Sequence, residues 1–294
     1  MPLAFPAVKQ PPTTREPRNM LLYGRTKVGK STIASMLPSA LHADLEGGTE
    51  LISTRRVRVT TPEELIEFAD ALPAQWRANP FRFLVIDTVD AIDDWGDPIA
   101  LARYRSLPMG KTFGGSTLRE LDRGAGYYYL REAFKGFLAK LMANAMWSTI
   151  FIGHVRDKYS DGTKIGTDVS EVDIDLAGKA KSIMCARMDA IGYAFRDALG
   201  VLKVSFASKD QVNCGIRSPY LAGKVFTFTT PARAEDWKQI YPDSWDKVPV
   251  VASTAVPASP QPAPAIKPSI STVQGTSTPA APVPPQPISP SPKP

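Results

Sequence analysis

The stretch from residue 19 to residue 38 constrains this chain more than any other. An apolar segment, 20–23, runs into the pattern Gly-x-x-x-x-Gly-Lys-Ser, and a helical pattern follows until Pro38. Glycine lets the backbone turn tightly, and the first N–H groups of a helix attract anions. Such a turn between a strand and a helix is a P-loop, which binds nucleotide phosphates. We therefore expect a nucleotide to be held by Gly24, Arg25, Thr26, Lys27, Val28, Gly29, Lys30, Ser31 and Thr32.

A magnesium ion is expected beside this loop. In a P-loop the lysine, here Lys30, supplies charge to the β- and γ-phosphates, and the hydroxyl of Ser31 is a ligand for Mg²⁺. The apolar run 81–88 is typical of a strand that is buried on both faces of a parallel sheet, and Asp87 stands at its end. An aspartate there would also suit a helix cap. Downstream of a P-loop it is better interpreted as the Walker B aspartate, which holds Mg²⁺ through water.

Strands and helices alternate along the chain. A short strand is expected at 40–45, a helix that begins at 61–64, and a strand at 148–153. Further strands are expected at 189–195, 201–207 and 225–228, and a helical pattern runs from 127 to 146. This alternation predicts an α/β fold with a mostly parallel central sheet flanked by helices. Glu46 and His154 each follow one of the strands, so both are expected at the edge of the sheet that carries the P-loop.

Composition limits the class of protein. The chain has 294 residues, a formal net charge of +6 and two cysteines, Cys185 and Cys214. The charge permits nucleic-acid binding without requiring it. Two separated cysteines and two separated histidines provide no zinc spacing, and no apolar run is long enough to span a bilayer. We expect a cytoplasmic protein without membrane contact.

Composition also divides the chain into three parts. Residues 1–18 contain five prolines, which exclude a helix and predict an extended arm in which Leu3 and Phe5 are free to dock. Residues 249–294 contain 14 prolines and no acidic or aromatic residue, which predicts a disordered tether. The folded core is therefore expected at 19–248.

Two segments are rich in glycine and basic residues. The segments are 104–126 and 156–171, and we expect both to be mobile loops that leave the sheet near the nucleotide. Single-stranded nucleic acid needs positive charge along its backbone and side chains that stack on bases. The candidates are Arg105, Lys111, Arg119, Arg123, Lys158, Tyr159 and Lys164. Ordinary solvated loops have a similar composition, so this alternative stays open.

Taken in order, these motifs resemble the RecA-type ATPases. More narrowly, the chain is similar to small phage proteins that consist of the RecA core alone and serve in single-strand annealing and recombination. The resemblance covers about residues 19–230 and rests on the P-loop, on Asp44-Leu45-Glu46, on 83–88 and on 151–156. It implies a RecA-like fold, ATP and Mg²⁺ as ligands, and the cytoplasm of a host cell as the location.

The resemblance also implies roles for single residues. Glu46 would be the catalytic base that activates water, and His154 would sense the γ-phosphate. The two basic loops would bind single-stranded DNA. Lys209 or Arg217 would reach the γ-phosphate of a neighbouring subunit in a homo-oligomer. The proline-rich tail would contact a single-strand-binding protein or another replication partner. For each of these residues a purely structural role is the alternative.

Two other functions remain open at this stage. A nucleotide or small-molecule kinase shares the P-loop, and the segment 104–126 would then serve as its lid. A non-hydrolysing scaffold would use ATP only to fix its shape and would recruit partners through the tail. Glu46 and His154 suit water activation and phosphate sensing better than the kinase alternative.

Overall fold

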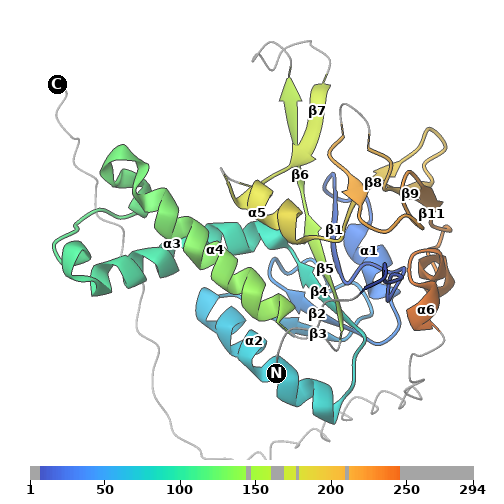
Figure 1. Cartoon of the computed structure of the whole chain (residues 1–294), viewed down its shortest axis with the longest axis horizontal. Coiled ribbons are helices and arrows are strands. Elements are labelled where there is room, and N and C mark those ends of the chain that lie inside the picture. The colour runs from blue at the N-terminus through green and yellow to red at the C-terminus, as the bar shows by residue number, and fades with distance from the viewer. Residues whose placement is uncertain (1–6, 144–146, 160–168, 177–178, 209–211, 246–294) are drawn as a thin grey trace, which may run out of the picture. The chain divides into compact units, whose positions relative to one another are not determined.

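A nine-stranded sheet organises the part of the chain that the computed structural model describes (Figure 1). The described residues are 7–143, 147–159, 169–176, 179–208 and 212–245, all within the unit formed by residues 1–251. The predicted tail, together with Leu3 and Phe5, lies outside these residues.

The strand order is β11-β9-β8-β1-β5-β4-β2-β3, and β10 pairs with β8. Strands β1, β2, β3, β4, β5 and β8 are parallel to their neighbours in this series, whereas β9, β10 and β11 join in antiparallel fashion. The bounds are β1 Asn19–Gly24, β2 Ala40–Asp44, β3 Arg56–Arg58, β4 Phe83–Asp87, β5 Ser148–Gly153, β8 Ala190–Arg196, β9 Leu202–Ser205, β10 Gly215–Ile216 and β11 Val225–Thr227. Strand β5 lies between β1, which leads into the P-loop, and β4, which ends at Asp87. The residue after β5, His154, therefore lies between the ends of these two strands.

Both faces of the sheet are covered, which explains why its central strands are apolar without alternation. The helices are α1 Lys30–Ser35, α2 Pro62–Ala78, α3 Val89–Ser106, α4 Gly126–Met142, α5 Ala180–Arg187 and α6 Pro242–Trp245, with a 3₁₀ helix, η4, at Ala234–Gln239. Leu21 of β1 packs in the core that contains residues of α2, α3, α4 and α5. Its neighbour Leu22 packs in the core that contains residues of α1 and η4. A strand buried in this way gains from an apolar residue at every position.

Most expected elements form at the expected places, and the predicted fold class is confirmed. The start of α2 shows the local reason. Thr61 caps the helix by accepting a hydrogen bond from Glu64 N at 3.2 Å, and Glu64 accepts one from Thr60 N at 2.6 Å. Pro62 occupies the first turn, where it needs no hydrogen-bond donor. The expectation from 61–64 was therefore sufficient to place this helix.

The segment 104–126 differs from the expected mobile loop. Residues 104–106 belong to α3, a helix that the sequence did not reveal because Pro98 interrupts its pattern. The rest folds into three short 3₁₀ helices, η1 Pro108–Gly110, η2 Leu118–Glu120 and η3 Asp122–Gly124. Tyr104 and Leu118 are buried there, with Phe113 packed against them, so this connection between α3 and α4 has an apolar core of its own.

The second expected loop, 156–171, also contains regular structure. Residues Val155–Tyr159 form β6 and residues Val169–Ile174 form β7, and the two strands pair antiparallel as a separate two-stranded sheet (Figure 1). Residues 160–168, which include Lys164, are outside the described residues. The sequence missed α5, β3 and β10 as well, each of which is short.

Candidate functional site

The loop between β1 and α1 takes a conformation that its two glycines make possible. A side chain at Gly24 would lie 2.4 Å from the backbone oxygen of Ala194 on β8, so only glycine fits there. Gly29 has φ +115°, in the region that favours glycine, and it directly precedes α1. Arg25, Thr26 and Lys27 are exposed along the loop, whereas Val28 is buried. The loop is thus anchored at both ends and open to solvent between them.

Lys30 is held inside the loop. Its Nζ donates hydrogen bonds to the backbone oxygens of Gly24 at 2.8 Å and Arg25 at 3.0 Å. An ammonium group has three donors, so one remains for a phosphate oxygen. Burial lowers the pKa of Lys30, and the negative charges of Asp87, Asp90 and Glu46 oppose that shift. The loop therefore positions a cation, and carboxylates from neighbouring segments interact electrostatically with it.

Asp87 is suited to be a ligand for Mg²⁺. It ends β4 and is buried, and its Oδ2 has no hydrogen-bond partner. Burial raises the pKa of Asp87 to about 6, against a lowering effect of a hydrogen bond with the Ser31 side chain. A buried carboxylate oxygen without a partner is costly unless a cation neutralises it. Asp87 and Ser31 are thus the oxygen donors that would hold Mg²⁺ beside the P-loop.

A tight turn presents Glu46 above the end of β2. Asp44 is buried and accepts hydrogen bonds from Gly47 N at 2.6 Å, Thr49 Oγ1 at 2.6 Å and Arg58 Nη1 at 3.2 Å. These bonds fix the turn 45–49, and the Glu46 side chain is 44% exposed. Asp44 therefore acts as the support for this turn, and Glu46 is the carboxylate that faces the site.

His154 is held by a partner that the sequence did not reveal. Its Nδ1 lies 2.6 Å from Asp90 Oδ2, and its backbone N donates to the same oxygen at 3.1 Å. Asp90 belongs to the first turn of α3, three residues after Asp87. It was missed from the sequence because this helix was not predicted. The hydrogen bond with Asp90 raises the pKa of His154, against the effects of burial and of Lys30. With Nδ1 engaged, the other ring nitrogen, Nε2, is the one available to a ligand.

Glu46 and His154 lie close together. Glu46 Oε1 is 3.9 Å from His154 Nδ1, and it accepts a hydrogen bond from Thr88 Oγ1. Ligand atoms of Glu46, Asp90 and His154 lie within 4.8 Å of one another, near enough to share a cation. Asp90 Oδ2 already binds His154 twice, and Glu46 is hydrogen-bonded to Thr88, so we interpret the three side chains as a cluster held by these hydrogen bonds beside the P-loop rather than as a metal centre.

A second residue missed from the sequence lies on the opposite side of the loop. A side chain at Gly29 would meet Arg196 Nη2 at 3.5 Å and Leu202 Cδ2 at 3.3 Å, which places the guanidinium of Arg196 beside the P-loop. Arg196 ends β8 and donates to the backbone oxygen of Gly200 at 2.7 Å. The only available signal was that it follows the expected strand 189–195.

The other predicted residues lie away from this cluster or outside the described part. Arg105 donates to Gly115 O at 2.8 Å, and Arg119 pairs with Asp97 at 3.8 Å. Lys111 and Arg123 are exposed on the same connection between α3 and α4. Lys158 and Tyr159 are in β6, and Lys164 and Lys209 lie outside the described residues.

Arg217 lies at the end of the sheet where the parallel strands begin. It pairs with Asp189 at 3.1 Å and donates to Ala186 O at 2.7 Å, next to the start of β8. Because β8 runs parallel to β1, this is the end of the sheet opposite the P-loop. Arg217 therefore cannot reach the P-loop of its own chain, and a role toward a neighbouring chain stays a prediction.

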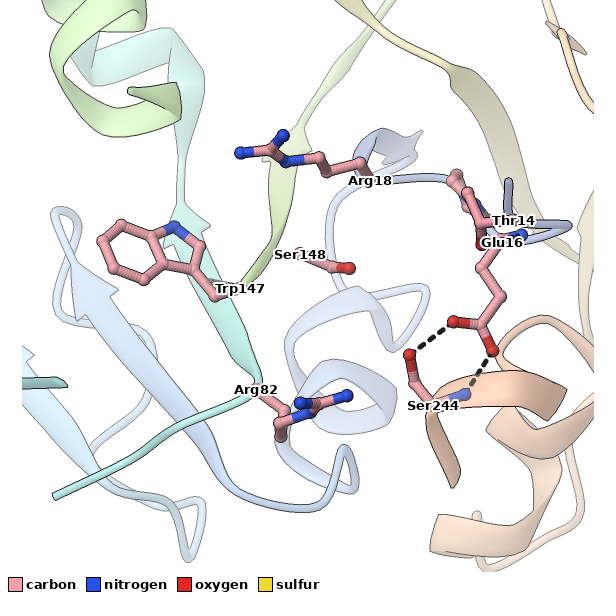
Figure 2. Close-up of a pocket in the computed structure, with 8 residues that line it drawn as sticks. Thr14, Glu16, Arg18, Arg82, Trp147, Ser148 and Ser244 are labelled. Atoms are coloured by element: carbon pink, nitrogen blue, oxygen red, sulfur yellow. Dashed lines mark hydrogen bonds between the residues drawn. The ribbon is translucent and has the colours of Figure 1, made fainter. Parts of the chain in front are cut away.

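A cavity of about 230 Å³ lies at the same end of the sheet as Arg217 (Figure 2). Arg18, Arg82 and Ser148 line it where β1, β4 and β5 begin. Figure 2 shows Glu16 bonded to Ser244, whose backbone N donates at 2.6 Å. This contact ties the segment before β1 to α6 and is remote from the nucleotide site.

Taken together, the fold and the loop define the class of this protein as an α/β protein with a P-loop and a mostly parallel central sheet. A family model described as an AAA domain matches residues 16–214, and the chain belongs to that family. No curated protein matches the chain. Among solved structures, the crystal structure of the RadB recombinase is similar, with a TM-score of 0.39 and 14% identity over 72% of this chain and 87% of that one. Among the described residues, none of the helices combines the length and apolar character needed to cross a membrane.

Proposed function

We propose that this protein binds and hydrolyses ATP with Mg²⁺ and couples that cycle to single-stranded DNA in recombination or strand annealing. The observation that carries the proposal is the convergence of Lys30, Asp87, Glu46 and His154 at the carboxyl ends of four parallel strands. These residues are far apart in the sequence. A P-loop that only binds a nucleotide does not need Glu46 or His154.

Each residue of the cluster has a chemical task in this proposal. The P-loop and Lys30 bind the phosphates, and Lys30 neutralises charge that develops on the γ-phosphate. Mg²⁺ held by Ser31 and Asp87 would withdraw charge from the β- and γ-phosphate oxygens. Glu46 orients a water molecule and accepts its proton, because its carboxylate is 44% exposed and lies 3.9 Å from His154.

His154 is proposed to report the state of the γ-phosphate. Asp90 holds the ring through Nδ1 and raises the pKa of His154, which favours the imidazolium form. In that form Nε2 also carries a proton and can donate a hydrogen bond to a phosphate oxygen. The strand β6 begins at the next residue, and Asp175 N donates to His154 O at 3.0 Å. A shift of His154 on hydrolysis would therefore reach the β6–β7 hairpin through the backbone.

The DNA-binding part of the proposal rests on exposed positive charge. Arg105, Lys111, Arg119 and Arg123 are exposed on the connection between α3 and α4. Lys158 and Tyr159 belong to β6, which adjoins His154, and Lys164 follows in the chain. Exposed cations suit a phosphate backbone. A kinase would place the phosphate-accepting substrate where the hydrolysis reaction places water. The arrangement of Glu46 beside Thr88 and His154 suits activation of water better than binding of such a substrate.

The test is steady-state ATP hydrolysis with Mg²⁺, measured with and without a single-stranded oligonucleotide. We expect hydrolysis that rises when the oligonucleotide is added and that the Glu46→Gln variant lacks. ATP binding without hydrolysis under either condition would favour the scaffold. Phosphate transfer to a nucleoside or small molecule, with no release to water, would favour the kinase and refute the proposal.

A further inference from the structure

A second pocket lies away from the P-loop, between α3, α4 and the start of α5. It has a volume of about 310 Å³, and its lining includes Asp93, Arg119, Tyr127, Arg131, Phe134 and Lys179. Helix α5 packs beside α4, as Figure 1 shows. Pockets that take small ligands have volumes of about 300–1,000 Å³, so this one has room for a ligand at the small end of that range.

The lining combines positive charge with an aromatic ring. Three of the six side chains are cationic and one is acidic, so the pocket favours an anion. Arg119 pairs only at 3.8 Å with Asp97 and keeps half of its side chain exposed. Tyr127 is 48% exposed, while Phe134 is buried and closes the apolar side. A planar ring with a phosphate attached satisfies both features at once.

The turn before α4 explains why Tyr127 is presented there. Arg123 and Gly124 have φ of 55° and 71°, so the chain reverses sharply before α4. A side chain at Gly126 would lie 1.7 Å from Leu118 O, which means that the start of α4 is packed directly on η2. Tyr127 is thus the first large side chain of α4, and a packed backbone holds its Cα in place.

We propose that this pocket holds one nucleotide unit of a single strand, with the base against Tyr127 and the adjoining phosphates on Arg119, Arg131 and Lys179. The inference rests on the proposed DNA binding and makes it specific, because it selects one site within the wider set of basic residues. Stacking on an aromatic ring accepts any base, so binding here would not depend strongly on sequence.

The position of the pocket suits coupling to ATP. Asp93 lies one turn after Asp90 on α3, and Asp90 holds the ring of His154. On the other wall, α5 begins shortly after Asp175, whose backbone N donates to His154 O. A ligand that shifts either wall would therefore act on an element that contacts His154.

The experiment compares two pocket variants with two matched controls. Tyr127→Ala is paired with Tyr128→Ala, since Tyr128 is its neighbour on α4, is 55% exposed and is absent from the pocket lining. Arg131→Gln is paired with Arg103→Gln, an exposed arginine on α3 that does not line the pocket. Fluorescence anisotropy with a labelled oligonucleotide across a salt series gives affinity and salt dependence. Titration of a fluorescent ATP analogue and the melting temperature show that each variant is folded.

We expect Tyr127→Ala to weaken oligonucleotide binding by about 5- to 150-fold, the range for loss of one stacked base. Arg131→Gln should reduce the log–log salt slope by about 0.7, the value for one phosphate contact with a single strand. Both controls should bind as the wild type does, and all four variants should bind the ATP analogue normally.

Three results would overturn the inference in distinguishable ways. If the wild type binds the oligonucleotide and both pocket variants bind equally well, DNA binding stands and the pocket assignment fails. If the wild type binds no oligonucleotide, the proposed DNA function fails together with the pocket. If an unlabelled mononucleotide such as dTMP, added with the P-loop saturated by ATP, competes as strongly as an oligonucleotide at equal nucleotide concentration, the pocket is a site for free nucleotides and not for a strand.

Discussion

Replacing Asp87 by asparagine should stabilise the free protein although it removes a proposed magnesium ligand. The carboxylate is buried, its Oδ2 has no partner, and burial raises its pKa to about 6 from an ordinary value of 3.8. Since a shift of one unit corresponds to about 1.4 kcal/mol, the ionised group costs about 3 kcal/mol of folding free energy above pH 6. Asparagine has nearly the same shape and carries no charge.

The sign of the pH dependence follows from proton binding. Between about pH 4 and pH 6 the folded protein holds the Asp87 proton more tightly than the unfolded chain, so the free energy of unfolding falls as the pH rises through this window. The cost is absent below the window and complete above it. Asp87→Asn avoids the cost but buries an amide that needs partners of its own, which offsets about 1–2 kcal/mol.

We therefore expect Asp87→Asn to raise the free energy of unfolding by about 1–2 kcal/mol at pH 8, with a clearly smaller gain at pH 5. The assay is urea denaturation at both values, with EDTA present and no nucleotide. Asp44→Asn is the matched control, since Asp44 stands beside Asp87 in the parallel register but accepts hydrogen bonds from Gly47, Thr49 and Arg58. Its asparagine variant should lose about 1–3 kcal/mol. A loss of stability in Asp87→Asn at pH 8, or a gain that is equal at both pH values, would refute the reasoning.

Further predictions concern the nucleotide site. Lys30→Ala should abolish ATP binding in a fluorescence titration, because it removes the ammonium group that Gly24 O and Arg25 O hold inside the loop; unchanged affinity would exclude Lys30 as a phosphate ligand. Glu46→Gln should still bind ATP while hydrolysis falls by about 10²-fold or more, and normal turnover would leave Glu46 as a turn residue only. Asp90→Asn should lower the pKa of His154, measured by NMR, because Asp90 is the main group that raises it; an unchanged value would contradict the observed pairing.

The sequence alone was sufficient for the P-loop and for the positions of the main strands along the chain. The glycines that permit the loop and the apolar runs that form β1, β4 and β5 act over a few neighbouring residues, so their consequences can be worked out from local rules. The same holds for the cap of α2 by Thr61. Even the grouping of Glu46 and His154 followed from the rule that parallel strands end at one edge.

Tertiary structure decided what surrounds those residues. Asp90 binds His154 although 64 residues separate them, and Arg196 lies beside Gly29 only because β8 pairs with β1. The connection between α3 and α4 looked like a mobile loop because its glycines and charges are local features, whereas the packing of Tyr104, Phe113 and Leu118 is not. Local sequence sets what a segment favours, but side-chain partners from distant segments decide which charges are paired, which are buried and which remain free to bind a ligand.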